Sequence, residues 1–509
     1  MHSVTLASVS LVASLLYTVW RLVYNIYFHP LAKFPGPWWA GATSYAEAYF
    51  DIIKGGRYFI EIEAMHARYG PIVRVTPTEL SIRDAEFYEH IYGSMNARRD
   101  VDETFARVTT ASTSLLCTVN HDHHRIRRGP LLGFFSKQAI TKLEPFISSR
   151  VGLLVEKLKR AYEVGHVIEA NDAYSALTTD IISFYAYGKS FDYLGKDTDS
   201  TFRNDFLHAL SDMAFAQPIM QHFPFVADCL RLLPEWLLTA LNPGISCANN
   251  LRIWCSTNAS KALEAAKSNK RKHSGKPETI FEALLSDSLP PEEKTLQRLT
   301  DEGIVILGAG LETTARYLTN VTTHLLLNPY CLAKLRAELK TVMPTPGDCP
   351  PSIILENLPY LSAVVQEGLR CERVLASRFT RKLVEPLPYK DFLIPAGTNI
   401  GCAIYLQNHI AEVFPEPDKF RPERWIEARE RGENLVKYLA TFVKGGRMCL
   451  GINLAYTELY MTVATIFRNF EMELVDSGLE DIAMARAYQF SFTEDYRWGV
   501  KVRITQVLK

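Results

Sequence analysis

The chain has 509 residues, 47 % hydrophobic and 22 % charged, which is ordinary globular composition and enough length to bury a large core. Lys plus Arg and Asp plus Glu each number 56, so the net charge is zero and we expect neither a nucleic-acid partner nor an acidic substrate. The nine cysteines are scattered, odd in number and without a close Cys-x-x-Cys pair, which argues against a disulfide framework and favours a reducing compartment.

An apolar run opens the chain. Val4–Trp20 is uncharged and mostly apolar, and Leu22–Phe28 extends it past Arg21 to the length of a membrane span. A cleaved signal peptide is the alternative, but no charged segment precedes the run and no clear cleavage site comes after it. We therefore expect residues 1–33 to be a membrane anchor and linker, and the basic residues Arg21 and Lys33 place the bulk of the chain in the cytosol.

The remaining residues, 34–509, are expected to form one domain. Its first residues, Phe34-Pro35-Gly36-Pro37, cannot continue a helix and predict a stiff hinge. Beyond the hinge, β-branched alternation in Ile72–Pro77 and Glu79–Ile82 predicts two paired short strands. Most of the chain from there to residue 340 has helical periodicity. The candidate helices are Asp84–Tyr92, Lys137–Tyr162, Ala170–Ala186 and Ser200–Ala216, and the polar, basic stretch Ser268–Lys276 is expected to be a loop.

Three histidines cluster in His121–Arg128, which reads HDHHRIRR. A metal site is one interpretation, but no cluster of carboxylates or cysteines accompanies them. His124 and Arg128 are four residues apart and therefore share one face of a helix. Taken alone, the segment also fits a solvated basic helix.

The run Glu292–Asn328 contains no proline and predicts one long helix, buried in its middle because Gly303–Gly310 is almost entirely apolar. Ala309-Gly310 is followed by Glu312 and then by Thr313-Thr314. A glycine and an acid inside a core helix break the local rules, which usually marks function. A kinked core helix, with a threonine bonded back to a carbonyl, is the alternative.

Two further stretches carry charges at helical or loop positions. Glu367 and Arg370 lie at i and i+3 and can pair on a helix, although such pairs are common on protein surfaces. Phe420–Trp425, which reads FRPERW, is a later charged stretch that we expect to be a loop. Asp391–Ile394 and Asn399–Ala403 are strand-like runs around a turn.

Near its C-terminus the chain reads FVKGGRMCLG, from Phe442 to Gly451, and a helix-compatible run, Ile452–Phe470, comes directly after it. Cys449 is flanked by glycines and preceded by Arg447. A helix N-terminus and a nearby cation stabilise a thiolate, and backbone N–H groups can tune a metal bound to it. A buried structural cysteine in a glycine-rich turn is the alternative.

This loop resembles the haem-binding loop of cytochromes P450, matching the family pattern at every fixed position: Phe442, Gly445, Arg447, Cys449 and Gly451. The other motifs occur in family order, so the resemblance covers nearly the whole chain. It implies one mostly helical domain with small sheets around haem b, preceded by a transmembrane helix. Details of the hinge, of the Glu367–Arg370 stretch and of the residues after it are similar to filamentous-fungal members.

The resemblance also implies residue roles. Cys449 would be the thiolate ligand of the haem iron. Glu312 and Thr313 would be the catalytic acid and alcohol that supply protons, and Gly310 would leave room for dioxygen. A structural set of charged residues would fix the core around the loop Phe442–Gly451; its members are Glu367, Arg370 and Arg424. The other expected haem contacts are His124, Arg128, Ala309, Phe442, Arg447, Gly451 and Arg381, the last preferred over Arg378 as a propionate contact.

The activity that this resemblance implies is insertion of one oxygen atom from O2 into a lipophilic secondary metabolite such as a terpenoid, polyketide or alkaloid. No flavin or nicotinamide motif is present, so electrons would come from NADPH–cytochrome P450 reductase at the endoplasmic-reticulum membrane, with Lys444 as a contact. A haem-thiolate isomerase or dehydratase, or a non-catalytic haem binder, is the alternative, but neither needs Glu312 and Thr313. The expected pocket residues are Phe215–Met220, Ile306, Val374–Phe379 and Ala487–Thr493.

Overall fold

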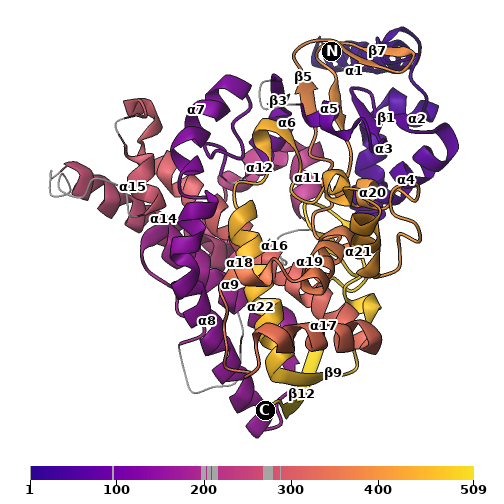
Figure 1. Cartoon of the computed structure of the whole chain (residues 1–509). Coiled ribbons are helices and arrows are strands. Elements are labelled where there is room, and N and C mark those ends of the chain that lie inside the picture. Colours follow the sequence, from indigo (N-terminus) through magenta and orange to yellow (C-terminus); the bar gives the residue numbers. More distant parts are fainter. Residues whose placement is uncertain are drawn as a thin grey trace.

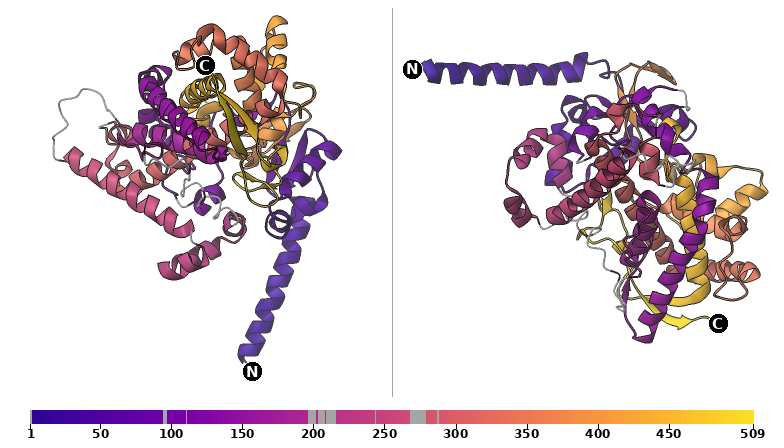
Figure 2. Two further views of the ribbon diagram at one scale, coloured as in Figure 1. Left: turned by 90° about the horizontal axis from the view of Figure 1, so that it is seen from below. Right: turned by 90° about the vertical axis from the view of Figure 1, so that its left-hand side faces the viewer.

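The computed structural model describes residues 2–93, 97–109, 111–195, 202, 208, 216–242, 244–267, 279–286 and 288–509. Most of them lie in helices, and the strands form small sheets (Figure 1). Helix α1 (His2–Val23) projects from this body as a separate rod (Figure 2). The predicted class is confirmed: a mainly helical fold with small sheets, after one N-terminal helix whose segment Ser8–Phe28 is long and apolar enough to span a membrane.

The helices of the first half are α2 (Trp38–Ala42), α3 (Tyr45–Ala48), α4 (Tyr58–Tyr69), α5 (Tyr88–Tyr92), α6 (Glu103–Val108), α7 (His121–Leu132), α8 (Lys137–Glu163), α9 (Ala170–Tyr187), α11 (Ala216–His222), α12 (Pro224–Arg231), α13 (Glu235–Leu241), α14 (Gly244–Lys267) and α15 (Ile280–Leu284), with π-helical turns η1 (Tyr24–Phe28) and η2 (Tyr49–Ile53). The helices of the second half are α16 (Leu296–Leu327), α17 (Pro329–Val342), α18 (Ser352–Leu355), α19 (Pro359–Cys371), α20 (Ile404–Asn408), α21 (Glu423–Glu430) and α22 (Ile452–Asn469), with 3-10 turns η3 (Pro291–Glu293), η4 (Leu435–Tyr438), η5 (Gly445–Arg447) and η6 (Leu479–Asp481).

Helix α5 is shorter than the predicted helix Asp84–Tyr92. The Asp84 carboxylate accepts the backbone N–H of Phe87 at 3.2 Å, so these residues form a turn and the helix begins only at Tyr88. Helices α8 and α9 each extend one residue past their predicted ends. Most of the expected helix Ser200–Ala216 lies outside the described residues, as does the expected loop Ser268–Lys276.

Five strands form the largest sheet, in the order β1-β2-β8-β5-β3. The predicted pair β1 and β2 is antiparallel, with Ile72 opposite Ile82. The predicted runs around residue 396 fall into different sheets, because β7 pairs with β6 while β8 lies between β2 and β5. The strands are β1 (Ile72–Thr76), β2 (Glu79–Ile82), β3 (Arg99–Val101), β4 (Ile168–Glu169), β5 (Arg381–Leu383), β6 (Leu387–Tyr389), β7 (Phe392–Ile394), β8 (Asn399–Gly401), β9 (Phe470–Leu474), β10 (Arg486–Ala487), β11 (Ser491–Phe492) and β12 (Lys501–Val507).

Helix α16 is the central element of the core. It has 32 residues and starts at Thr295, whose side chain accepts the Arg298 backbone N–H at 3.2 Å. Most of its side chains are buried against α9, α14, α19 and α22. In its middle, however, Ala309 is exposed and Gly308 and Thr313 are half-buried. An accessible strip inside a core helix marks the wall of an internal space.

The hinge packs on the domain. Pro35 accepts the backbone N–H of Arg74 at 2.7 Å, and the buried Arg74 guanidinium donates to the carbonyl oxygens of Asn25 at 2.9 Å and Pro77 at 2.8 Å. Gly36 has φ +155°, and a Cβ there would lie 2.8 Å from the Arg74 carbonyl oxygen. One buried arginine of strand β1 therefore fixes both the end of the anchor segment and the hinge.

Candidate active site

The loop Phe442–Gly451, called the thiolate loop from here on, forms a tight turn directly before α22. The backbone N–H of Cys449 donates to the Phe442 carbonyl at 2.9 Å. Gly445 has φ +73°, and a Cβ there would lie 2.4 Å from the Gly93 carbonyl oxygen. Only glycine fits that position. The pattern of glycines around the cysteine is therefore a packing requirement between this loop and the end of α5.

Cys449 is exposed, although it lies within the folded body. Burial raises the pKa of its thiol, while the Gly451 backbone N–H and the charge of Arg128 lower it. The two observations agree if the thiol borders an internal space that is shielded from bulk solvent. A thiol in such a place becomes a thiolate when a metal cation replaces its proton.

The histidines of α7 lie in different surroundings. His123 lies 2.5 Å from Glu293, whereas His124 is buried on another side of the helix. Among the residues that the structure describes, the one set of three possible metal ligands within reach of one another is Glu47, Asp51 and His222. The expectation that His121–Arg128 holds no metal stays a prediction.

Four cationic or titratable side chains gather near Cys449 instead: His124, Arg128, Arg381 and Arg447. Burial, and then the charges of the three arginines, lower the pKa of His124 to about 2. Burial, and then Arg381 and Arg128, lower the pKa of Arg447 to about 9. Buried cationic groups that repel one another in this way are typical of a site that binds anions.

The donors of these arginines are only partly used. Arg447 donates to the carbonyl oxygens of Thr118 at 2.7 Å and Val119 at 2.8 Å, and Arg381 donates to those of Phe379 and Thr380 at 3.0 Å each. Nε of Arg128 and Nε of Arg447 are buried without a partner, and none of the three arginines pairs with a carboxylate within the described part of the chain.

Arg378, the second choice for a propionate contact, is committed elsewhere. Its guanidinium lies 2.5 Å from Glu79 and 2.6 Å from Glu47, both of which are buried. A cation that already neutralises two buried carboxylates has no charge to offer a ligand. The geometry therefore favours Arg381 over Arg378 as the propionate contact.

The middle of α16 brings together the predicted acid and alcohol. Oγ1 of Thr313 donates to the Ala309 carbonyl at 2.9 Å, as in the alternative interpretation of this helix. Glu312 is 1 % exposed, and its Oε1 accepts Nε of Arg316 at 2.5 Å. Burial raises the pKa of Glu312, and Arg316 opposes this effect.

Gly310 allows α16 to pack closely against α9, while its expected role of leaving room for dioxygen stays a prediction. A Cβ at this position would lie 2.7 Å from Cγ1 of Ile182 on α9. At Gly308, by contrast, a Cβ would meet nothing within 4 Å. The missing side chain of Gly310 therefore serves the close approach of α9 and α16, and Gly308 and Ala309 border the internal space.

Glu367, Arg370 and Arg424 lie together at the end of α19. Glu367 is fully buried and accepts Arg370 at 3.0 and 2.8 Å and Arg424 at 3.1 Å. Two donors that sequence reasoning missed complete this set: Nε1 of Trp425 at 2.9 Å and the backbone N–H of Arg421 at 2.8 Å. Their only signal in the sequence was their place beside Arg424.

A pair of acids near the start of α16 was also missed. The Asp301 carboxylate accepts the backbone N–H of Thr113 at 3.1 Å and its hydroxyl at 2.6 Å, and Glu302 accepts the backbone N–H of Leu115 at 2.9 Å. The segment that contains Thr113 and Leu115 continues to Thr118 and Val119, whose carbonyl oxygens accept hydrogen bonds from Arg447. Two adjacent acids in a helix predicted to be buried were the available signal.

The expected pocket segments meet one another. Leu375 bridges to Phe490, the backbone N–H of Ser491 donates to the Val374 carbonyl at 2.9 Å, and Gln217 of α11 accepts the backbone N–H of Gln489 at 3.2 Å. The residues after α19, the hairpin β10–β11 and α11 thus form one continuous wall. Phe215, the first of the expected pocket residues before α11, lies outside the described residues.

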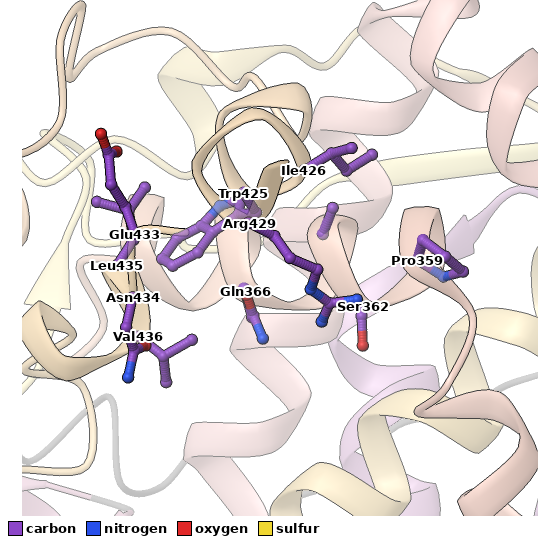
Figure 3. A pocket seen from close by; sticks show the side chains of 11 residues that line it. Pro359, Ser362, Gln366, Trp425, Ile426, Arg429, Glu433, Asn434, Leu435 and Val436 are labelled. Carbon is purple, nitrogen blue, oxygen red and sulfur yellow. The ribbon is translucent and has the colours of Figure 1, made fainter. Parts of the chain in front are cut away.

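A separate pocket of about 270 Å³ lies between α19 and α21 (Figure 3). Ser362 and Gln366 of α19, Trp425 and Arg429 of α21, and Leu435 of η4 line it. None of the predicted haem contacts or catalytic residues is part of it. Its one link to the predicted residues is Trp425, whose indole N–H binds Glu367.

Comparison with known proteins agrees with this arrangement. The family model described as "Cytochrome P450" matches residues 48–494. The conidiogenone synthase PchP450 of Penicillium rubens is 39 % identical over 96 % of both chains. The cytochrome P450 monooxygenase TRI4 of Fusarium sporotrichioides is 38 % identical over 96 % of this chain and 92 % of its own. The cytochrome P450 monooxygenase aflU of Aspergillus parasiticus is 36 % identical over 97 % and 98 %, respectively.

Proposed function

The chain belongs to the cytochrome P450 family of haem-dependent monooxygenases, and we propose that it inserts one oxygen atom from O2 into a lipophilic secondary metabolite, with haem b held through Cys449. The observation that carries this proposal is the group of His124, Arg128, Arg381 and Arg447 beside the Cys449 thiol. The three arginines have no carboxylate partner among the described residues, and the two propionates of haem b would supply anionic partners, to which His124 can add a hydrogen bond.

When bound, the haem supplies the redox chemistry, in which R–H, O2, two electrons and two protons give R–OH and water. The chain supplies the position, the protons and the dry surroundings. Arg128, Arg381, Arg447 and His124 would hold the propionates. Thr313 on the accessible face of α16 and the buried Glu312 next to it would pass protons to the reaction, and Gly308 and Ala309 keep that face free of bulky side chains.

The electrons would come from NADPH–cytochrome P450 reductase, a separate protein, with Lys444 beside the thiolate loop as a contact. Helix α1 would anchor the chain in the endoplasmic-reticulum membrane, with the catalytic domain in the cytosol. The apolar span Ser8–Phe28, only 6 % buried, and the basic residues Arg21 near its end and Lys33 after it support this placement.

The substrate class is supported by the relatives and by the wall of the site. The relatives include a conidiogenone synthase and two fungal monooxygenases. Ile306 is buried, and Val374, Leu375 and Phe490 provide apolar surface. A terpenoid, polyketide or alkaloid skeleton fits these surroundings.

The first experiment tests the thiolate. The reduced protein under carbon monoxide should show the red-shifted Soret band of a thiolate-bound haem, and Cys449→Ser should lose it. Cys402→Ser is the matched control, because Cys402 is buried and has no part in the loop. A wild-type protein without this band, or a Cys449→Ser variant that keeps it, would refute the assignment.

The second experiment tests the reaction. The holoenzyme is combined with NADPH–cytochrome P450 reductase, NADPH and O2, and panels of terpenoids, polyketides and alkaloids are searched for products that gain one oxygen atom. Products that form without O2 or NADPH would instead indicate an isomerase or dehydratase. Substrate-independent haem binding, with no NADPH consumption under any condition, would indicate a non-catalytic haem protein.

A further inference from the structure

Arg316 is a buried cation one helical turn beyond Glu312. Its side chain is among the largest that are fully buried, with 1 % exposure. Nε donates to Oε1 of Glu312 at 2.5 Å, and Nη1 donates to the carbonyl oxygen of Ser491 at 2.6 Å. The guanidinium therefore joins the acid of α16 to strand β11, which lies 175 residues away in the sequence.

Aromatic rings enclose the same guanidinium. Cζ of Arg316 lies 5.5 Å from the ring of Phe490, 5.3 Å from that of Phe492 and 4.8 Å from that of Trp498. Each of these distances suits a cation–π contact, and such contacts are strongest when the cation is desolvated. Phe490 also bridges to Leu375 in the wall of the expected substrate pocket. The segment that holds Arg316 is thus part of that wall.

The contacts leave specific polar atoms unused. Within the described part of the chain, Oε2 of Glu312, Oγ of Ser491 and Nε1 of Trp498 are buried and have no hydrogen-bond partner. All three belong to residues in contact with Arg316. Buried polar atoms are normally satisfied by protein or by ordered water. An acceptor, a hydroxyl and a donor around one guanidinium provide the partners that one or two internal waters need.

We propose that Arg316 is a positioning residue for the relay acid: it holds Oε1 of Glu312, so that Oε2 takes up protons from internal water bordered by Ser491 and Trp498. Because Oε1 is occupied, Oε2 is the oxygen left to exchange a proton. Arg316 has this task only if the proposed function is correct, since Glu312 delivers protons only in a chain that reduces dioxygen.

Other charged groups act on this pair. His208 and Asp172 form an ion pair at 3.2 Å and influence Glu312 with opposite signs. On another side, Glu372 is buried, and the charge of Arg316 opposes the rise in its pKa to about 7. On α22, Glu458 is hydrogen-bonded to Thr314, and burial raises its pKa. A variant of Arg316 therefore needs a readout that reports on Glu312 itself.

The experiment compares Arg316→Met and Arg316→Lys with wild type and with Arg468→Lys. Arg468 is the matched control, because it is 3 % exposed and donates to the carbonyl oxygens of Met343 and Pro344 instead of a carboxylate. The first readout is the infrared band of a protonated carboxyl group in the resting holoenzyme at neutral pH. Arg316→Met should gain intensity in this band that the double variant Arg316→Met/Glu312→Gln lacks, whereas Glu372, whose pKa also depends on Arg316, contributes equally to both variants.

The second readout is the pH profile of NADPH oxidation with reductase and O2, without added substrate, together with the division of the products between hydrogen peroxide and water. The midpoint should move upward by about one pH unit in Arg316→Met and by less in Arg316→Lys, which keeps the charge. Arg468→Lys should keep the wild-type midpoint.

The outcomes separate the two proposals. A wild-type protein without the thiolate-type carbon monoxide band refutes the proposed function. If the band is present and Arg316→Met shows neither a new carboxyl band nor a shifted midpoint, the role of Arg316 is refuted. If Arg316→Met yields no holoenzyme, Arg316→Lys decides, because a merely structural role predicts the same midpoint as Arg468→Lys.

Discussion

Glu367 and Glu312 are both buried carboxylates that bind arginine, and they differ in how many of their hydrogen bonds are made. Glu367 receives donors from Arg370, Arg424, Trp425 and the backbone of Arg421. Glu312 receives a donor from Arg316, and its Oε2 has no partner among the described residues.

Their pKa values move in opposite directions. Burial alone would raise the pKa of Glu367, but the hydrogen bonds and charges of Arg370 and Arg424 outweigh burial and hold that pKa below its ordinary value. At Glu312 burial prevails over the single arginine and raises the pKa. A fully bonded carboxylate is locked in its charged form and serves the fold, whereas a half-bonded one can exchange a proton.

The largest expected effect comes from breaking the fully bonded site. Glu367→Gln removes the charge between two buried arginines and should lower the free energy of unfolding by about 3–5 kcal/mol. The yield of protein with the thiolate-type band and urea unfolding measure it. Glu433→Gln, which breaks an exposed pair with Arg431, should leave the free energy of unfolding nearly unchanged, because solvent screens such pairs. If Glu367→Gln and Glu433→Gln lowered the free energy of unfolding equally, the structural role of the fully bonded Glu367 would be refuted.

Two neighbouring arginines differ in a similar way: Arg378 is paired with carboxylates, whereas Arg381 pairs with none in the described part of the chain. Arg378→Met leaves the buried Glu47 and Glu79 without their cation and should destabilise the fold by about 3–5 kcal/mol. Arg381→Met breaks no ion pair and should instead speed the loss of haem. Thermal unfolding and the rate of haem transfer to apomyoglobin measure the two effects. A variant of Arg381 that unfolds easily but keeps its haem would be the opposite result.

Packing around the half-bonded site gives a smaller effect. Gly310→Ala should cost about 1–3 kcal/mol, because its Cβ meets Ile182 at 2.7 Å. Ile182→Ala should relieve part of that cost in the double variant. Gly308→Ala, with open space at its Cβ, should be neutral or stabilising by about 0.5–1 kcal/mol. Chemical denaturation of these variants and of wild type measures the differences.

The smallest expected effect is on the pH dependence of the free energy of unfolding, to which Glu367 and Glu312 should contribute slopes of opposite sign. Glu367 has a lowered folded pKa, so its stabilisation is present above its ordinary value and is lost as the pH falls through the folded value. Glu312 has a raised pKa, so the folded state binds the extra proton and stability falls as the pH rises from the ordinary value toward the raised one.

These slopes can be measured as the difference in unfolding free energy between wild type and each glutamine variant. The difference should increase with pH for Glu367→Gln and decrease with pH for Glu312→Gln, by about 1.4 kcal/mol per unit of pKa shift. Slopes of the same sign would show that both carboxylates are equally locked.

Periodicity in the sequence is enough to predict α8, α9, α16 and α22 within a few residues, and short motifs are enough to single out Glu367, Arg370 and Arg424, which the structure joins. The cause is local, since helical periodicity and short spacings are written in neighbouring residues. Helix α5 was predicted too long because a side chain, that of Asp84, competes with the helix for its first hydrogen bond.

Contacts between distant segments could not be predicted. The sequence ranks Arg381 ahead of Arg378 as a propionate contact, but it does not show that Glu47 and Glu79 approach Arg378. The pair Glu312 and Arg316 is spaced like many surface pairs, and its meaning depends on burial beneath Phe490 and Trp498. The role of Gly310 depends on Ile182 of another helix.

The contacts of Arg74 have a consequence for orientation. Because one guanidinium ties residues 25 and 77 together and the hinge packs on its backbone, the domain is not free to swivel about its N-terminal helix. If that helix is inserted in a bilayer, as proposed, the contacts of Arg74 on β1 would set the tilt of the domain over the lipid surface. An exchange of residues 2–23 for another apolar helix should preserve that tilt, whereas Arg74→Ala should release it.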